Sequence, residues 1–152
     1  MAAGDITLFN EFAENMGKEV FNFSSDTIKA GIITNAVTPT AADSTPTWSD
    51  YSANQVATGT SYTGPVTITT NWTRSGATSE LTGVSFTLTK DAGSGFNNGY
   101  WLIIFDDTEA SDAAIAFMEL GGPVDLSALD VNIKFNNAAV GVAGRIFSGA
   151  AA

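Results

Sequence analysis

The sequence is dominated by short runs in which apolar and polar residues alternate one by one. In the clearest run Val66, Ile68, Thr70 and Trp72 occupy every second position, and threonine or asparagine lies between them. A period of two residues places successive side chains on opposite faces of a β-strand. Further runs of this kind lie at residues 27–34, 84–88 and 131–135. Many short strands separated by Gly, Asn and Ser turns predict a mainly β, single-domain fold, an antiparallel β-sandwich or a barrel-like relative of one.

Other segments fit the same fold class. The run Tyr100–Phe105 is continuously apolar, which predicts a central strand buried on both faces. A shorter strand is expected over Val20–Phe23. Residues Ala113–Leu120 fit either a strand or a helix by pattern; their neighbours favour a strand, and Gly121-Gly122-Pro123 is expected to end it.

One helix is expected, at the N-terminus. Between Asp5 and Gly17 an apolar stripe recurs at helical spacing, formed by Leu8, Phe9, Phe12, Ala13 and Met16. Asp5 can cap the start of this amphipathic α-helix and Gly17 can end it. The expected organisation is an N-terminal arm and helix at residues 1–17, a β-sandwich at 18–148 and a short tail at 149–152, all in the single domain 1–152.

The charge of the chain argues against several partners. Its 152 residues carry 16 acidic and six basic side chains, a formal net charge of −10, and the basic residues are not clustered. Binding to nucleic acid depends on positive charge that displaces counterions from phosphates, so no direct nucleic-acid partner is expected. An anionic membrane surface is disfavoured for the same reason, and no apolar run approaches the ~20 residues of a membrane-spanning helix.

The chain contains neither histidine nor cysteine. The commonest general base, the commonest metal ligand and the most reactive nucleophile are therefore missing. We expect a protein that is not an enzyme, with no catalytic residues, no cofactor and no dedicated metal site. Asp106, Asp107, Glu109 and Asp112 form the densest carboxylate group. They lack the spacing of a calcium loop, so a solvated acidic turn is the favoured interpretation, and the question of a bound cation stays open.

Two segments carry candidate contact residues for a partner subunit or a larger assembly. Leu8, Phe9 and Phe12 lie on the stripe of the predicted helix, which either packs on its own sandwich or reaches a neighbour. Trp48 and Tyr51 stand in the polar, proline-containing segment 35–54. They either fix this loop to the sheet or remain exposed for a ligand; flat aromatics on a β-sandwich can stack on sugar rings.

Five segments, read in order, resemble a known group of proteins: LFNEFAENMGKEVFNF, DTIKAGIIT, WSDYSANQVATGTSYTG, GYWLIIFDDT and VDLSALDVNIKFNNAAVGVAGRIF. The succession is similar to a family of small structural proteins of tailed bacteriophages, described as head decoration, cement or tail-associated proteins. The resemblance spans roughly residues 5–147.

The resemblance implies a virion component, made in the host cytoplasm and located on the outer surface of the phage head. Its expected partners are the major capsid protein and copies of itself, with a trimer fitting local threefold positions best. The alternative is a tail-associated or host-adhesion protein that binds carbohydrate. Under the first interpretation, we expect deletion of residues 1–17 to leave the sandwich folded and to weaken capsid binding.

Overall fold

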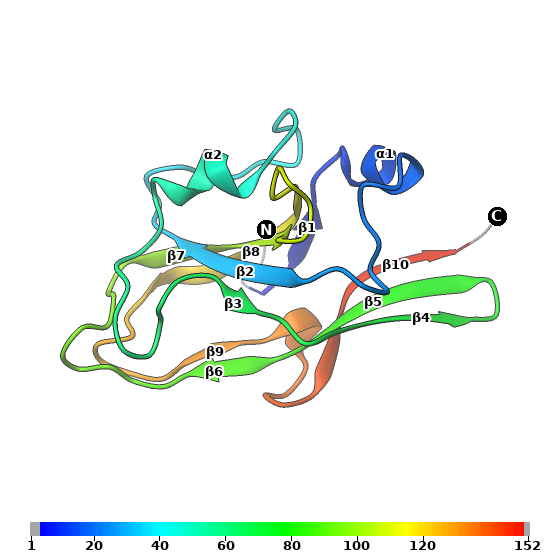
Figure 1. The fold of residues 1–152 in the computed structure, drawn as a ribbon. Helices are drawn as coiled ribbons and strands as arrows, with labels where there is room; N and C mark the ends of the chain where they lie inside the picture. Colours follow the sequence, from blue (N-terminus) through cyan, green and yellow to red (C-terminus); the bar gives the residue numbers. More distant parts are fainter. Residues whose placement is uncertain (1–3, 151–152) are drawn as a thin grey trace.

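The computed structural model describes residues 4–150 and is mainly β, with 40% strand and 10% helix. Every strand pairing is antiparallel, which confirms the predicted fold class. The largest sheet has the order β1-β8-β7-β2-β3 (Figure 1). Its strands are β1 (Ile6–Leu8), β8 (Ala114–Val124), β7 (Gly99–Asp106), β2 (Ile28–Ile33) and β3 (Val66–Thr67).

A second layer lies below this sheet in Figure 1. It consists of a three-stranded sheet and a two-stranded sheet. The first has the order β10 (Ala143–Ala150), β5 (Thr78–Val84), β4 (Thr70–Ser75), and the second pairs β6 (Phe86–Leu88) with β9 (Val131–Ile133).

The segment that contains β3 and β4 joins the two layers. The Ile68 N–H donates to the Ile28 carbonyl of β2 at 2.8 Å, and the next residue, Thr69, accepts from the Val84 N–H at 2.9 Å. Pairing therefore passes from β2 to β5 between two consecutive residues. This shared corner gives the sandwich its barrel-like character.

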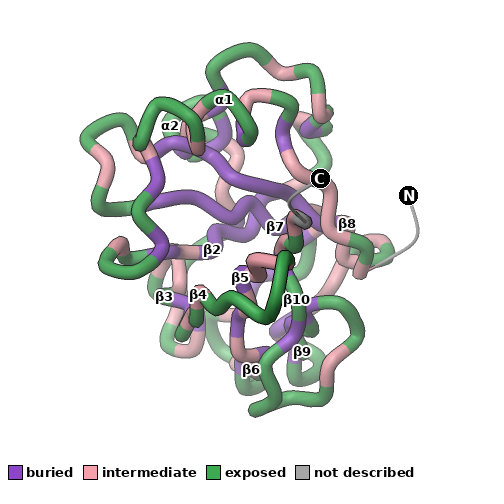
Figure 2. Tube along the Cα trace, turned by 90° about the vertical axis from the view of Figure 1, so that its right-hand side faces the viewer, coloured by how far each residue is buried: buried purple, intermediate pink, exposed green. Residues whose placement is uncertain are grey.

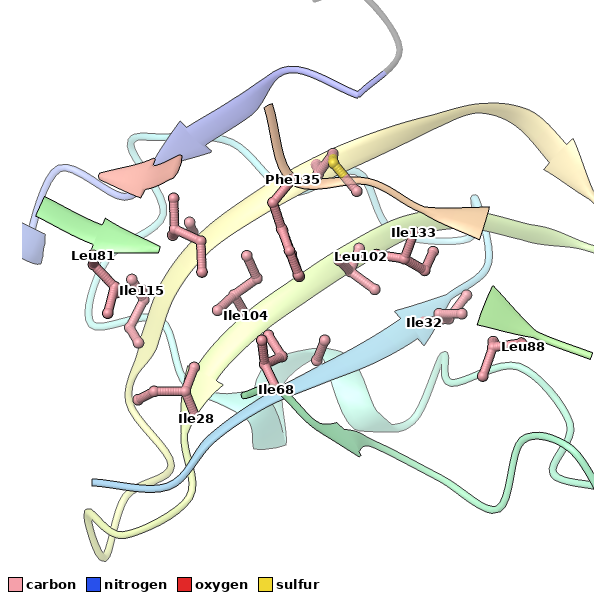
Figure 3. Packing of buried hydrophobic residues seen from close by; sticks show 14 of the residues in the cluster. Ile28, Ile32, Ile68, Leu81, Leu88, Leu102, Ile104, Ile115, Ile133 and Phe135 are labelled. Atoms are coloured by element: carbon pink, nitrogen blue, oxygen red, sulfur yellow. The ribbon is translucent and has the colours of Figure 1, made fainter. Parts of the chain in front are cut away.

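The main core lies between the two layers (Figure 3). The alternating run predicted at residues 27–34 forms β2, which turns Ile28, Ala30 and Ile32 into this core. On β7, Leu102 and Ile104 also point into this core, while the alternate residues of the strand face the opposite side of the sheet. The prediction of a central strand buried on both faces is confirmed by this division.

A short helix, α2 (Trp48–Ser52), covers the opposite face of the large sheet. The Trp48 ring stacks on Phe105, with ring centroids 5.0 Å apart and planes 5° from parallel. This close approach requires Gly31 beneath it, because a Cβ at that position would lie 2.3 Å from Cη2 of Trp48. The Thr47 N–H donates to Asp50 Oδ2 at 2.8 Å at the start of α2. The expected loop 35–54 therefore contains a helix that seals a second, smaller core.

The N-terminal helix is shorter than predicted. Residues Ile6–Leu8 form β1, which pairs with β8 from Met118 to Ala116, and α1 spans only Phe12–Gly17. The helical stripe was misleading because Phe9 and Phe12 belong to different cores, on the two faces of the large sheet. Pairing with β1 satisfies the backbone hydrogen-bonding groups along one edge of β8. A helix over Asp5–Gly17 would leave this edge unpaired.

Five further boundaries differ from the prediction. No strand forms at Val20–Phe23, where the Asn22 carbonyl instead accepts the N–H groups of Ser25 and Asp26 in a turn. The predicted strand 84–88 divides between β5 and β6, and strand 131–135 ends at Ile133, before the short helix η1 (Phe135–Asn137). Strand β8 continues through the glycines expected to end it, because positive φ angles of 89° and 110° at Gly121 and Gly122 accommodate an irregular register. The expected tail begins inside β10, and residues 1–3 and 151–152 lie outside the described residues.

Candidate functional site

The structure buries two of the three predicted N-terminal contact residues inside their own subunit. The Phe9 side chain is 1% exposed, with its ring centroid 5.0 Å from that of Phe117. Phe12 is 3% exposed and lies in the main core. Leu8 is partly buried against the same core. Of the two interpretations of the apolar stripe, packing on the same subunit therefore holds for Phe9 and Phe12, and their choice as candidate contacts is corrected, because a buried ring offers no surface to a partner.

The two aromatic residues of α2 are also packed inside. Trp48 is 9% exposed and Tyr51 is 3% exposed. The Tyr51 hydroxyl donates to Asp43 Oδ2 at 2.7 Å, and both burial and this carboxylate raise the pKa of the phenol. Trp48 and Tyr51 thus fix the loop to the sheet, as the first of the two interpretations of this segment expected, and their choice as candidate contact residues is corrected.

The carbohydrate-binding alternative depended on exposed aromatic rings. Tyr62 lies in the core, where its hydroxyl accepts the Ile32 N–H at 2.9 Å. Trp72 lies parallel to Phe147, with ring centroids 6.3 Å apart. Across residues 4–150, every Phe, Trp and Tyr side chain is buried or partly buried. Stacking on a sugar therefore has no fully exposed ring to use in this part of the chain.

The predicted carboxylate group is divided among separate structural tasks. Asp107 pairs with Lys29 at 2.7 Å, Glu109 accepts the N–H of Ala110, and the Asp112 carbonyl accepts the Trp48 N–H. Asp106 is turned into the protein. Within residues 4–150, no three His, Cys, Asp or Glu side chains are grouped closely enough to hold a metal ion. Nor does any described helix combine the length and apolar character needed to cross a membrane.

Asp106 is the unusual member of this group, because its side chain is fully buried. Its Oδ1 atom accepts the Thr108 N–H at 2.8 Å and the Glu109 N–H at 3.4 Å, whereas Oδ2 has no hydrogen-bond partner. Burial, together with the neighbouring Asp26 carboxyl, raises the pKa of Asp106 to about 6. A carboxyl in this position takes up a proton more readily than in water, which supplies the missing hydrogen bond.

The three-stranded sheet has an open backbone edge along β4. This sheet extends beyond the layer above it in Figure 1, and Figure 2 shows exposed residues along β4. No strand among the described residues pairs with the outer side of β4. Its exposed side chains are Asn71, Thr73, Arg74 and Ser75. An unpaired edge of this kind can accept another strand.

The register identifies which backbone groups of β4 face outward. The Thr69 carbonyl accepts the Val84 N–H of β5. In the regular antiparallel pairing that follows, every second residue of β4 forms its backbone hydrogen bonds with β5, namely Asn71, Thr73 and Ser75. The N–H groups of the alternate residues, Trp72 and Arg74, therefore point away from β5. These two N–H groups make the outer side of β4 a possible point of attachment for a further strand.

No protein-family model, curated protein or solved structure matches this chain.

Proposed function

We propose that this chain is a non-enzymatic structural protein of a tailed phage particle, a decoration or cement protein that binds the outer surface of the head. Its partners would be the major capsid protein and further copies of the chain. The observation that carries the proposal is the open β4 edge with its hydroxyl and amide side chains. The resemblance of the sequence to small phage structural proteins supports a phage particle as the partner to which this edge would bind.

Strand addition suits a cement protein because it joins two proteins through backbone hydrogen bonds and needs no reactive side chain. A chain in which only 14% of the residues are charged also favours contacts that salt screens weakly. Modest affinity is sufficient for each copy, since attachment is repeated over the head. The net charge of −10 keeps the free protein soluble before it assembles.

Copy number tests the proposal directly. Purified virions that contain the chain should hold on the order of hundreds of copies, one or more at each repeated position of the head. Quantitative mass spectrometry against the major capsid protein measures this ratio. About a dozen copies or fewer would place the chain in the tail or in a host-adhesion structure, and its absence from the finished particle would overturn a virion role.

Arg74→Pro tests the β4 edge. Proline removes an N–H that points away from β5, so the ladder with β5 is retained while an added strand loses one hydrogen bond and meets the ring. We expect binding to heads that lack the protein to weaken by about tenfold, which corresponds to about 1.4 kcal/mol. Co-sedimentation with purified heads measures the change.

Arg74→Ala is the matched control for this variant. It removes the same side chain, including its 2.9 Å bond to the Gly76 carbonyl, and keeps the backbone N–H. Binding should remain close to that of the unaltered chain. Equal losses in the alanine and proline variants would show that the side chain acts, and unaltered binding by a folded proline variant would rule out the β4 edge.

A further inference from the structure

Two carboxyl groups, those of Asp26 and Asp106, lie side by side at one end of the large sheet. Asp106 is the last residue of β7, and its register partner on β2 is Ile28. Asp26 precedes Ile28 by two residues, so an extended chain places its side chain on the same face of the sheet as Ile28 and Asp106. Burial and the Asp26 carboxyl together raise the pKa of Asp106. The two carboxyls therefore meet on the face that covers the main core.

No positive charge neutralises this pair. Strand β2 carries one basic residue, Lys29, but alternation turns it to the other face of the sheet, where it pairs with Asp107 at 2.7 Å. The remaining charged neighbour, Glu109, is acidic as well. Among residues 4–150, neither Asp26 nor Asp106 forms an ion pair. Because Asp106 is fully buried and its Oδ2 has no partner, ionising both carboxyls at this separation is strongly unfavourable.

Of the two carboxyls, only that of Asp26 is free to move away. Strand β7 lies between β2 and β8, and Oδ1 of Asp106 accepts the Thr108 and Glu109 N–H groups. Asp26 belongs to residues 24–27, all of which are exposed or partly exposed. Displacing this segment uncovers little apolar surface, so it costs much less than opening the core.

Two hydrogen bonds hold segment 24–27 against the end of the sheet. The Thr27 N–H donates to Thr108 Oγ1 at 2.7 Å, and the Asp107 N–H donates to the Thr27 carbonyl at 2.9 Å. Thr27 is adjacent to Asp26, and Asp107 is adjacent to Asp106. Separating the two carboxyls therefore breaks both bonds, and the two N–H groups report whether the segment is closed.

We propose that Asp26 and Asp106 form a proton-dependent latch, which holds segment 24–27 on the sheet while the pair shares a proton and releases it when both carboxyls are ionised. In the closed form the proton supplies the hydrogen bond that Oδ2 of Asp106 lacks. Release separates the two charges and admits water to the buried carboxyl. The latch is a property of the single chain and does not depend on the proposed virion role.

The pH range of the latch follows from the buried carboxyl. The pKa of Asp106 is about 6 in the folded chain, against an ordinary 3.8. The closed form is therefore fully favoured below about pH 4 and loses this advantage as the pH rises to about 6. Each unit of difference in pKa changes the opening equilibrium tenfold, so release should become up to about 100-fold more frequent above pH 6.

Hydrogen exchange measured by NMR on the intact chain tests the latch. The probes are the backbone N–H groups of Thr27 and Asp107. At pH 7.5 both should exchange at least about tenfold more slowly in Asp106→Asn than in the unaltered chain, because the amide NH₂ donates without an added proton. At pH 4 the two proteins should exchange alike. The Thr60 N–H, which donates to Asp91 Oδ2 at 2.8 Å in a different exposed turn, should exchange equally in both proteins at either pH.

Asp26→Asn provides a second variant on the exposed side of the pair, where the substitution does not alter the core. It should slow the exchange of Thr27 at pH 7.5 in the same way. Asp107→Asn removes a carboxylate from the opposite face of the same strand end and should not slow it. Equal slowing by Asp107→Asn would assign the effect to net charge and overturn the latch. Equal exchange at pH 7.5 in the unaltered chain and both variants of the pair would also overturn it, whatever the copy number in the virion.

Discussion

Replacing Phe12 with alanine should lower the free energy of unfolding by about 3–5 kcal/mol, the usual cost of removing a buried aromatic ring. The loss would be a large part of the stability of a typical domain, about 5–15 kcal/mol. The ring centroid of Phe12 lies 4.7 Å from that of Phe147, 5.9 Å from that of Phe21 and 6.1 Å from that of Phe23. This one side chain therefore connects α1, the turn that follows it and strand β10.

Urea unfolding followed by circular dichroism measures the effect. Glu14→Ala is the matched control: Glu14 lies on the same helix, and its side chain is exposed beside Lys18, so little change is expected. A loss in the Phe12 variant no greater than that of the control would contradict the packing argument.

The same packing reverses the expectation for the truncated chain. Deleting residues 1–17 removes Phe9 and Phe12 from the two cores and removes β1 from the edge of β8. We now expect the truncation to destabilise the sandwich more than Phe12→Ala does. Weaker capsid binding by that truncation would then reflect unfolding, which makes single variants on the exposed edge the better test of function.

The sequence predicted best the strands in which one local pattern, alternation or a continuous apolar run, extends over the whole element. Alternation predicted the inward residues of β2 because one face of this strand meets the large core, and the apolar run of β7 predicted burial on both faces. The N-terminal segment was misread because Leu8, Phe9 and Phe12 also fit a helical stripe. Only tertiary contacts, Phe9 with Phe117 and Phe12 with Phe147, show that the segment changes face part-way.

The candidate contact surface was harder to predict than the fold. Trp48 and Tyr51 stand out in a polar segment, yet Trp48 packs over Gly31 and Phe105, and the Tyr51 ring stacks with that of Phe9. The exposed segment 139–143 was not predicted as a contact surface, although its run of small apolar residues is visible in the sequence. Its exposure depends on bonds to Ser85, more than 50 residues earlier in the chain, which no local pattern reveals.

Asp106→Asn should stabilise the protein above pH 6 and have little effect near pH 4. In the folded state the pKa of Asp106 is raised from its ordinary 3.8 to about 6, so the folded protein retains a proton that the unfolded chain releases. Stability from this group is complete below about pH 4, declines as pH rises to about 6 and is constant above that. The decline is at most about 3 kcal/mol, since each unit of difference between the folded and unfolded pKa corresponds to about 1.4 kcal/mol.

Asparagine imitates the protonated carboxyl. Its amide oxygen can accept the Thr108 and Glu109 N–H groups, and its NH₂ can donate toward Asp26. The charged groups around the site are Asp26, Asp107, Lys29 and Glu109. Unfolding at pH 4, 5, 6 and 7 gives the stability difference between the variant and the unaltered chain, which should grow with pH across this range and then level.

Two further variants separate the buried proton from general charge effects. Asp107→Asn also removes one carboxylate, but that side chain is partly exposed and paired with Lys29, so it should not reproduce the rise in stability. Asp26→Asn removes the like charge that helps to raise the pKa of Asp106, so the decline in stability should end at a lower pH. A difference between Asp106→Asn and the unaltered chain that stays constant from pH 4 to 7 would show that Asp106 is ionised throughout. Its unpartnered Oδ2 would then be a charged, desolvated atom whose cost the rest of the fold must offset.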